Sequence, residues 1–134
     1  MAYVVWINSS SAPFLDDIEA RLKPLETRSR NMLGRLVGQR VVLAESARKQ
    51  RLARCSVFIR SVRTVTTWEE WDALRPLHRV PVGNQYDWKP ETKIKYLYEL
   101  TNLRRLRPFR IPETGTVPRG RSYAEIKGKD EHHE

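Results

Sequence analysis

Three charged side chains of complementary type follow one another at short spacing in the first quarter of the chain. They are Lys23, Glu26 and Arg28. A lysine can neutralise a phosphate or activate a water, a glutamate can exchange a proton or accept a hydrogen bond from a base, and an arginine can hold an oxyanion or a base edge. The segment therefore has the chemistry to bind, or act on, a polar anionic ligand.

The same spacing is also typical of an ion-pair set on a strand surface. Glu26 and Arg28 are two residues apart, so in an extended segment their side chains point to the same face. A joint binding site and a simple ion pair both require this. Neither Lys23 nor Glu26 is needed to fill the apolar core, so we expect their replacement to damage ligand handling much more than folding.

The charge balance favours an anionic partner. The 134 residues include 25 Lys and Arg against 16 Asp and Glu, which gives a net charge of +9. A field of this sign attracts polyanions, and the planar fork of arginine matches phosphate oxygens in pairs. We expect one arginine group to contact a nucleic-acid backbone, and its members are Arg104, Arg105 and Arg107.

Aromatic residues offer a second means of binding nucleic acid, because a flat ring can stack on a base. Tyr86 and Trp88 lie in a loop rich in glycine and amides, which predicts that they are exposed or fold as a lid over a pocket. Trp6 fits a stacking or a core role equally well. Trp68 and Trp71, at helical spacing, are expected in the core.

Other chemistries find little support in the sequence. The histidines are His78 and the adjacent His132 and His133 near the C-terminal end, so no Ser-His-Asp or Cys-His set stands out. Cys55, the single cysteine, lies in a β-rich run and is expected to fill the core. We expect no metal and no cofactor.

The elements that position these residues begin with a β-rich run over 3–7. A polar cluster leads from it into a helix over 12–22, which Pro24 ends, and an extended segment follows at 25–28. The helix has one apolar stripe that faces inward, consisting of Phe14, Leu15, Ile18 and Leu22.

Further along, alternating or short apolar runs predict strands at 41–44, 53–65, 93–100 and 121–126. Between the second and third of these, Thr67 and Glu70 fit a capping box that opens a short helix, and Pro76 is expected to end it.

Several short strands with an N-terminal helix and one further short helix predict an α+β domain around a small curled β-barrel, mostly antiparallel. We expect one domain over 1–127 and a flexible polar tail over 128–134. No apolar run is long enough to span a membrane and no export signal is visible, which predicts a soluble cytoplasmic protein.

The segment from Lys23 to Arg28, placed after an amphipathic helix and followed by Gly38 and a valine-rich strand, resembles the signature of the ASCH family. That signature has a lysine, then a glutamate, then an arginine ahead of a glycine and an apolar strand. The stretches 96–100, 106–109 and 120–126 are similar to the closing strands of small bacterial ASCH proteins. The resemblance covers roughly residues 3–126.

The resemblance implies a PUA-like barrel whose first helix and Lys-Glu-Arg strand border a cleft, with roles in RNA binding, RNA processing or hydrolysis of a modified nucleoside. The loop over 8–11 should approach this cleft. The expected ligand-binding residues are Ser9, Ser10, Lys23, Glu26, Arg28, Tyr86, Trp88 and Arg121. The expected partner is RNA or another single-stranded nucleic acid, or a nucleotide or modified nucleoside.

The alternative is a small hydrolase acting on RNA or a modified nucleoside, with Lys23 and Glu26 as the acid–base pair. Related acetylcytidine amidohydrolases place a threonine nucleophile three residues after the lysine, where this chain has Glu26. Thr27 should face the other side of the strand from Glu26, so the nucleophile role is not transferred to it.

Overall fold

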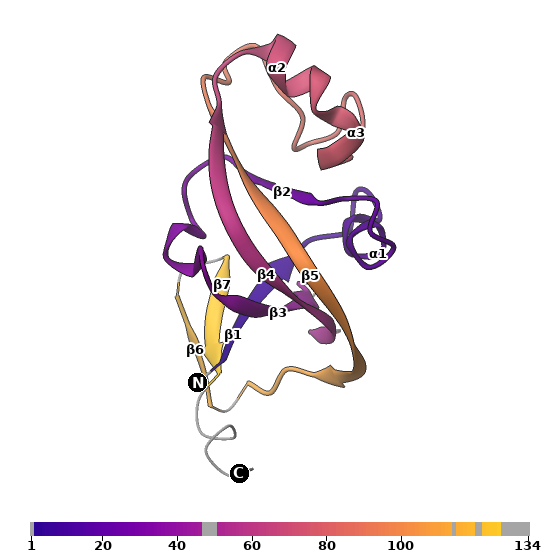
Figure 1. Ribbon diagram of the computed structural model, residues 1–134, viewed down its shortest axis with the longest axis vertical. Helices are drawn as coiled ribbons and strands as arrows, with labels where there is room; N and C mark the ends of the chain where they lie inside the picture. Colours follow the sequence, from indigo (N-terminus) through magenta and orange to yellow (C-terminus); the bar gives the residue numbers. More distant parts are fainter. Residues whose placement is uncertain (1, 47–50, 114, 120–121, 127–134) are drawn as a thin grey trace.

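Two long strands organise the chain into one twisted sheet, and they run along most of the length of the molecule (Figure 1). The computed structural model describes residues 2–46, 51–113, 115–119 and 122–126. The elements in these residues are β1 (Ala2–Ile7), α1 (Phe14–Glu19), β2 (Leu25–Arg28), the 3-10 turn η1 (Gly34–Leu36), β3 (Arg40–Glu45), β4 (Leu52–Val65), α2 (Trp68–Ala73), α3 (Arg75–His78), β5 (Lys95–Arg110), β6 (Thr116–Pro118) and β7 (Tyr123–Ile126).

The sheet is open rather than closed. Its seven strands within the described ranges follow the order β2-β5-β4-β3-β1-β7-β6, in which β1 and β3 are parallel and the other neighbours are antiparallel. The predicted α+β class and the mostly antiparallel pairing are confirmed. The predicted closure into a barrel is wrong, because β2 and β6 form the two edges and no ladder between described residues joins them.

The predicted strands are all present, but the fifth is twice as long as expected. β5 continues from Lys95 through the arginine-rich stretch to Arg110 and pairs with β4 along almost its whole length. β2 covers β5 only near its start, so the second half of β5 is a sheet edge. An edge tolerates Pro108 and exposed arginines, which explains why apolar alternation did not reveal this half.

Both predicted helical regions, the one over 12–22 and the one that follows Thr67, have other boundaries than expected. α1 ends at Glu19, and Arg21 adopts a left-handed backbone (φ 62°) that turns the chain three residues before Pro24. Leu22 is consequently outside the helix and 49% exposed, so its core placement is wrong. Pro76 does not end a helix but lies in the first turn of α3, where its missing N–H costs nothing, so two further helices are present instead of one.

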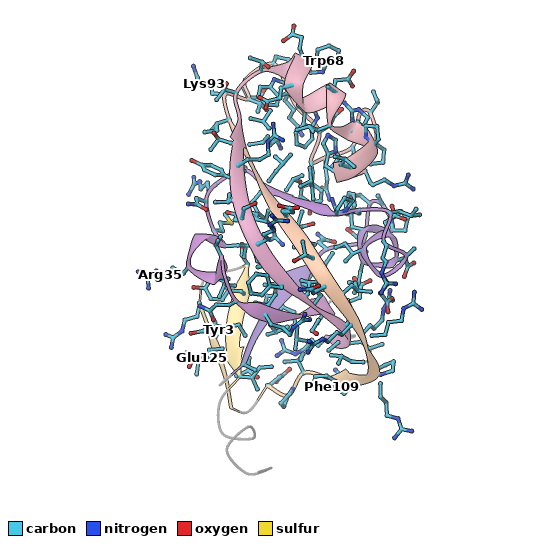
Figure 2. All side chains as sticks on the ribbon, viewed as in Figure 1. Tyr3, Arg35, Trp68, Lys93, Phe109 and Glu125 are labelled. Carbon is cyan, nitrogen blue, oxygen red and sulfur yellow. The ribbon has the colours of Figure 1, made fainter. Side chains whose placement is uncertain are left out.

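The start of α2 follows the predicted cap. The Thr67 hydroxyl accepts from the Glu70 N–H at 3.2 Å, whereas the Glu70 carboxylate pairs with Arg63. Trp71 is fully buried as predicted, but Trp68 is 49% exposed. Trp68 is the first residue of the helix and lies at the outer end of the molecule (Figure 2), so its core placement is wrong.

The apolar core occupies the concave side of the sheet. It combines Phe14 and Ile18 of α1 with inward residues of the strands, among them Val57 and Ile59. The Cys55 thiol is buried in this core, as predicted, and burial raises its pKa to about 11. None of the helices in the described residues is long and apolar enough to cross a membrane.

A buried polar cluster connects α2, α3 and the loop before β5. The His78 ring stacks on Trp71 with ring centroids 3.8 Å apart. His78 Nε2 lies 2.9 Å from the Trp71 carbonyl, and Nδ1 accepts from the Val80 N–H at 3.0 Å. These contacts fit a neutral ring that donates from Nε2. Burial lowers the pKa of His78 to about 4.

The lowered pKa predicts a loss of stability in acid. The folded state disfavours the charged ring, so the stabilisation is complete above pH 6.5 and is lost as pH falls through about 4, by on the order of 3 kcal/mol. Urea unfolding at a series of pH values measures it. His78→Gln keeps one donor and one acceptor without titrating, and we expect its stability to change much less over this window.

Equal pH dependence in the wild type and in His78→Gln would contradict this assignment and attribute the acid sensitivity to carboxyl groups.

Candidate functional site

A pocket of about 650 Å³ lies where β2 faces the end of β1 and the loop before β5. The lining residues come from segments far apart in the sequence, and they are Trp6, Ile7, Asn8, Phe14, Lys23, Glu26, Thr27, Arg28, Ser29, Met32, Ser46, Gln85, Tyr86, Asp87, Lys89, Thr92, Lys95 and Ser122.

Arg28 connects the β2 edge of the sheet to the strands on its far side. Its guanidinium donates to the Trp6 carbonyl at 3.0 Å and lies 3.4 Å from the Ser122 hydroxyl. The same group pairs with the Glu26 carboxylate at 2.9 Å. Trp6 and Ser122 are themselves joined by a backbone hydrogen bond. Arg28 thus bridges the seam between the sheet ends and forms one wall of the pocket.

Lys23 is buried beneath this wall, with a side chain only 1% exposed. Its ammonium donates to the carbonyl oxygens of Leu25 and His78, at 2.9 and 2.5 Å, and lies 3.7 Å from the Glu26 carboxylate. Burial is the main cause that lowers its pKa, and the Glu26 carboxylate opposes this. Lys23 is not part of the apolar core, as expected, but it is buried and bonded to the backbone, so its replacement should affect folding as well as ligand handling.

Glu26 therefore lies between two cations, Lys23 and Arg28, and it too is largely buried. Such an arrangement holds a carboxylate in a fixed direction. The predicted Lys-Glu-Arg set is thus both an ion-pair set and part of the pocket lining, so the two interpretations of the spacing are compatible.

Tyr86 forms part of the opposite wall. Its hydroxyl accepts from the Asn8 side-chain amide at 2.9 Å, and its ring packs edge-on against Phe14 with centroids 6.1 Å apart. The Lys95 ammonium donates to the Tyr86 carbonyl at 2.9 Å. Burial, followed by repulsion from Lys89, lowers the pKa of Lys95. These contacts fix an aromatic ring beside the charged wall.

Asp87 anchors the loop that carries Tyr86. Its carboxylate accepts from the N–H groups of Gly83 and Trp88 and from the Trp71 indole, at 2.7 to 2.9 Å. Burial alone would raise the pKa of Asp87, but these hydrogen bonds and the Arg75 guanidinium outweigh it and lower the pKa to about 2. The loop is therefore pinned to α2 by an ionised carboxylate.

The structure brings four of the predicted ligand-binding residues together in the lining, namely Lys23, Glu26, Arg28 and Tyr86.

The remaining predicted residues have other positions. The Ser9 hydroxyl accepts from the Leu15 N–H at the start of α1, and the Ser10 N–H donates to the Asn8 side chain. Trp88 packs against the core beside Trp71. Arg121 lies outside the described residues.

The three arginines predicted to contact a nucleic-acid backbone are exposed on β5 and do not line the pocket. Arg105 donates to the Glu19 carbonyl at the end of α1. Arg104 lies opposite Ser56 in the ladder and close enough to Arg40 to lower its pKa, after burial, by repulsion. Arg104 and Arg105 therefore point to different faces of the sheet. The role of Arg104, Arg105 and Arg107 in nucleic-acid binding stays a prediction.

Several lining residues were missed, chiefly Lys89, Lys95 and Ser122. Both lysines follow Tyr86 closely in sequence, and that proximity was the available signal. Ser122 reaches the pocket only through the pairing of β7 with β1, which no local pattern indicates. Thr27, expected to face away from Glu26, also contributes to the lining.

Comparison with solved structures identifies the fold. The chain is similar to an ASCH protein from Zymomonas mobilis, with a TM-score of 0.71 and 14% identity over 97% of this chain and 90% of that one. A serine-to-alanine mutant of that protein gives 0.73 and 16% over the same shares. A tyrosine-to-phenylalanine mutant gives 0.62 and 12%, over 97% and 92%.

The α+β fold is thus similar to that of the Zymomonas mobilis ASCH protein, as the sequence suggested. No protein-family model matches the sequence. No curated protein matches it either.

The burial of Lys23 predicts that its ammonium supports the fold. We expect Lys23→Met to lower the free energy of unfolding by about 1–3 kcal/mol, because the carbonyls of Leu25 and His78 lose their donor. Lys93→Met, at an exposed position, is the matched control and should change stability by within about 0.5 kcal/mol. Denaturant titration measures both. Equal stability of the two variants would show that Lys23 is dispensable for folding.

Proposed function

We propose that this chain is an RNA- or nucleotide-binding domain that takes one nucleoside or nucleotide unit into the pocket beside Arg28. The observation that carries the proposal is the pairing of a fixed aromatic ring, Tyr86, with a carboxylate and a guanidinium, Glu26 and Arg28, in the walls of one pocket. A ring can stack on a base while Glu26 accepts from its N–H groups.

The size and charge of the pocket support this assignment. A volume of about 650 Å³ is in the usual range for small-molecule sites, roughly 300–1,000 Å³. Its lining includes four cationic side chains, Lys23, Arg28, Lys89 and Lys95, against the two carboxylates of Glu26 and Asp87. An excess of cations favours a ligand that carries phosphate.

A hydrolase is the second candidate, and the lowered pKa of Lys23 next to Glu26 favours it. A lysine whose pKa is lowered can act as a proton acceptor. Against this, the Lys23 ammonium already donates to two backbone carbonyls. We therefore assign Lys23 to holding Glu26 in place, and binding without turnover is the preferred function.

Glu26→Gln is expected to weaken binding of ribonucleoside monophosphates by about 10- to 150-fold, because a charge-assisted contact worth about 1.5–3 kcal/mol is lost. The amide can still accept from Arg28, so thermal unfolding should change little. Calorimetric titration with each of the four monophosphates measures the binding. Glu69→Gln removes an exposed carboxylate on α2 and is the matched control.

A sharp drop in melting temperature while Glu26→Gln still binds as the wild type does would assign Glu26 to the fold alone. A wild type that binds none of the four probes would contradict the proposed function itself.

Turnover separates the two candidate functions. We expect no release of product from labelled single-stranded RNA or from N-acylated nucleosides, because Lys23 is committed to backbone carbonyls. Incubation with wild-type protein followed by chromatography detects cleavage. Turnover that disappears in Glu26→Gln but persists in Glu69→Gln would establish the hydrolase instead.

A further inference from the structure

The convex face of the sheet carries a second group of residues, remote from the pocket lining. Val57 and Ile59 on β4 point into the concave core, so Phe58 between them points to the other side. Phe58 is half-buried and lies outside both the core described above and a second, smaller apolar cluster around Val4, Ala44 and Ala53. An aromatic ring is therefore presented on the open face of β4.

Two arginines flank this ring. Arg40 on β3 lies directly opposite Phe58 in the ladder. Arg104 on β5 lies opposite Ser56, two residues from Phe58 along β4. Side chains at directly opposite positions lie within about 5.5 Å at Cβ, and diagonal ones within about 8 Å. The name convex patch is used below for Phe58, Arg40 and Arg104.

The Arg40 guanidinium is held in a fixed orientation. It donates to the Ser56 hydroxyl at 2.9 Å and to the Asn102 carbonyl at 2.7 Å. Both contacts are to neutral oxygens, so the positive charge stays uncompensated. A guanidinium held in this way loses little side-chain entropy when it binds an anion.

No carboxylate neutralises the convex patch within the part of the chain that the structure describes. The ion pairs among the described residues involve arginines of β4 such as Arg54 and Arg60, but they involve neither Arg40 nor Arg104. Arg104 is exposed, and burial, followed by repulsion from Arg104, lowers the pKa of Arg40, which stays charged. Two like charges left side by side on an open sheet favour an anion between or beside them.

We propose that the convex patch binds single-stranded nucleic acid, with Phe58 stacking on a base and Arg40 and Arg104 each holding a flanking phosphate. The arrangement is a sheet surface with an aromatic ring between cations, which suits splayed bases and needs no base-edge readout. The proposal rests on the proposed function for its class of partner but on none of the pocket residues.

The test is fluorescence anisotropy of labelled oligouridylate and oligoadenylate over a range of salt. Phe58→Leu removes the ring but keeps an apolar side chain, and we expect affinity to fall about 5- to 150-fold. Arg104→Gln should reduce the slope of log affinity against log salt by about 0.7, and Arg40→Gln with Arg104→Gln by about twice that. Lys93→Gln, an exposed charge at the α2 end of the molecule (Figure 2), is the control.

The Arg104 side chain makes no hydrogen bond within the described residues, so Arg104→Gln remains informative even if Arg40→Gln unfolds. Unchanged affinity in Phe58→Leu together with an unchanged salt slope in Arg104→Gln would overturn the proposal, as would a wild type that binds no oligonucleotide at low salt.

Failure of the pocket has a different signature. If the wild type binds no mononucleotide but binds oligonucleotides, and Phe58→Leu weakens that binding, the result supports the convex patch and contradicts only the pocket. Oligonucleotide binding that depends on Glu26 and not on Phe58 or Arg104 contradicts the convex patch and supports the pocket.

Discussion

The contact of Arg28 with the far side of the sheet is the constraint on which the arrangement of the site depends. The seven-stranded sheet has β2 at one edge and β6 at the other, and it curls without closing. A hydrogen-bond ladder does not join the curled ends. One guanidinium does so, by contacting the Trp6 carbonyl, the Ser122 hydroxyl and the Glu26 carboxylate. The gap that would be sealed in a closed barrel is therefore available as a pocket, with charged side chains in its wall.

The second wall depends on a chain of buried polar contacts that begins at Asp87. This carboxylate ties the Tyr86 loop to the indole of Trp71, and the Trp71 ring stacks on His78. The His78 carbonyl then accepts from Lys23, which lies next to Glu26. The loop and the charged wall are consequently joined through one continuous set of contacts, so a change at α2 can alter the pocket.

The sequence predicted the class of fold and the charged part of the site, because both depend on local patterns. Alternating apolar residues located β4, and the spacing of Lys23, Glu26 and Arg28 placed three lining residues on one short segment. Burial of Lys23 was not predictable, since its partners are backbone carbonyls, one of them 55 positions away. The open sheet and the position of Ser122 are likewise results of long-range pairing, and exposure of Trp68 follows from where α2 packs.

The most direct test of the central claim is an NMR titration of isotope-labelled wild-type protein with a ribonucleoside monophosphate, followed residue by residue. The account predicts that the largest shift changes occur at the pocket beside Arg28, in the backbone amides of Trp6, Arg28 and Tyr86. Saturable shifts confined to other surfaces, with these three signals unmoved, would contradict it.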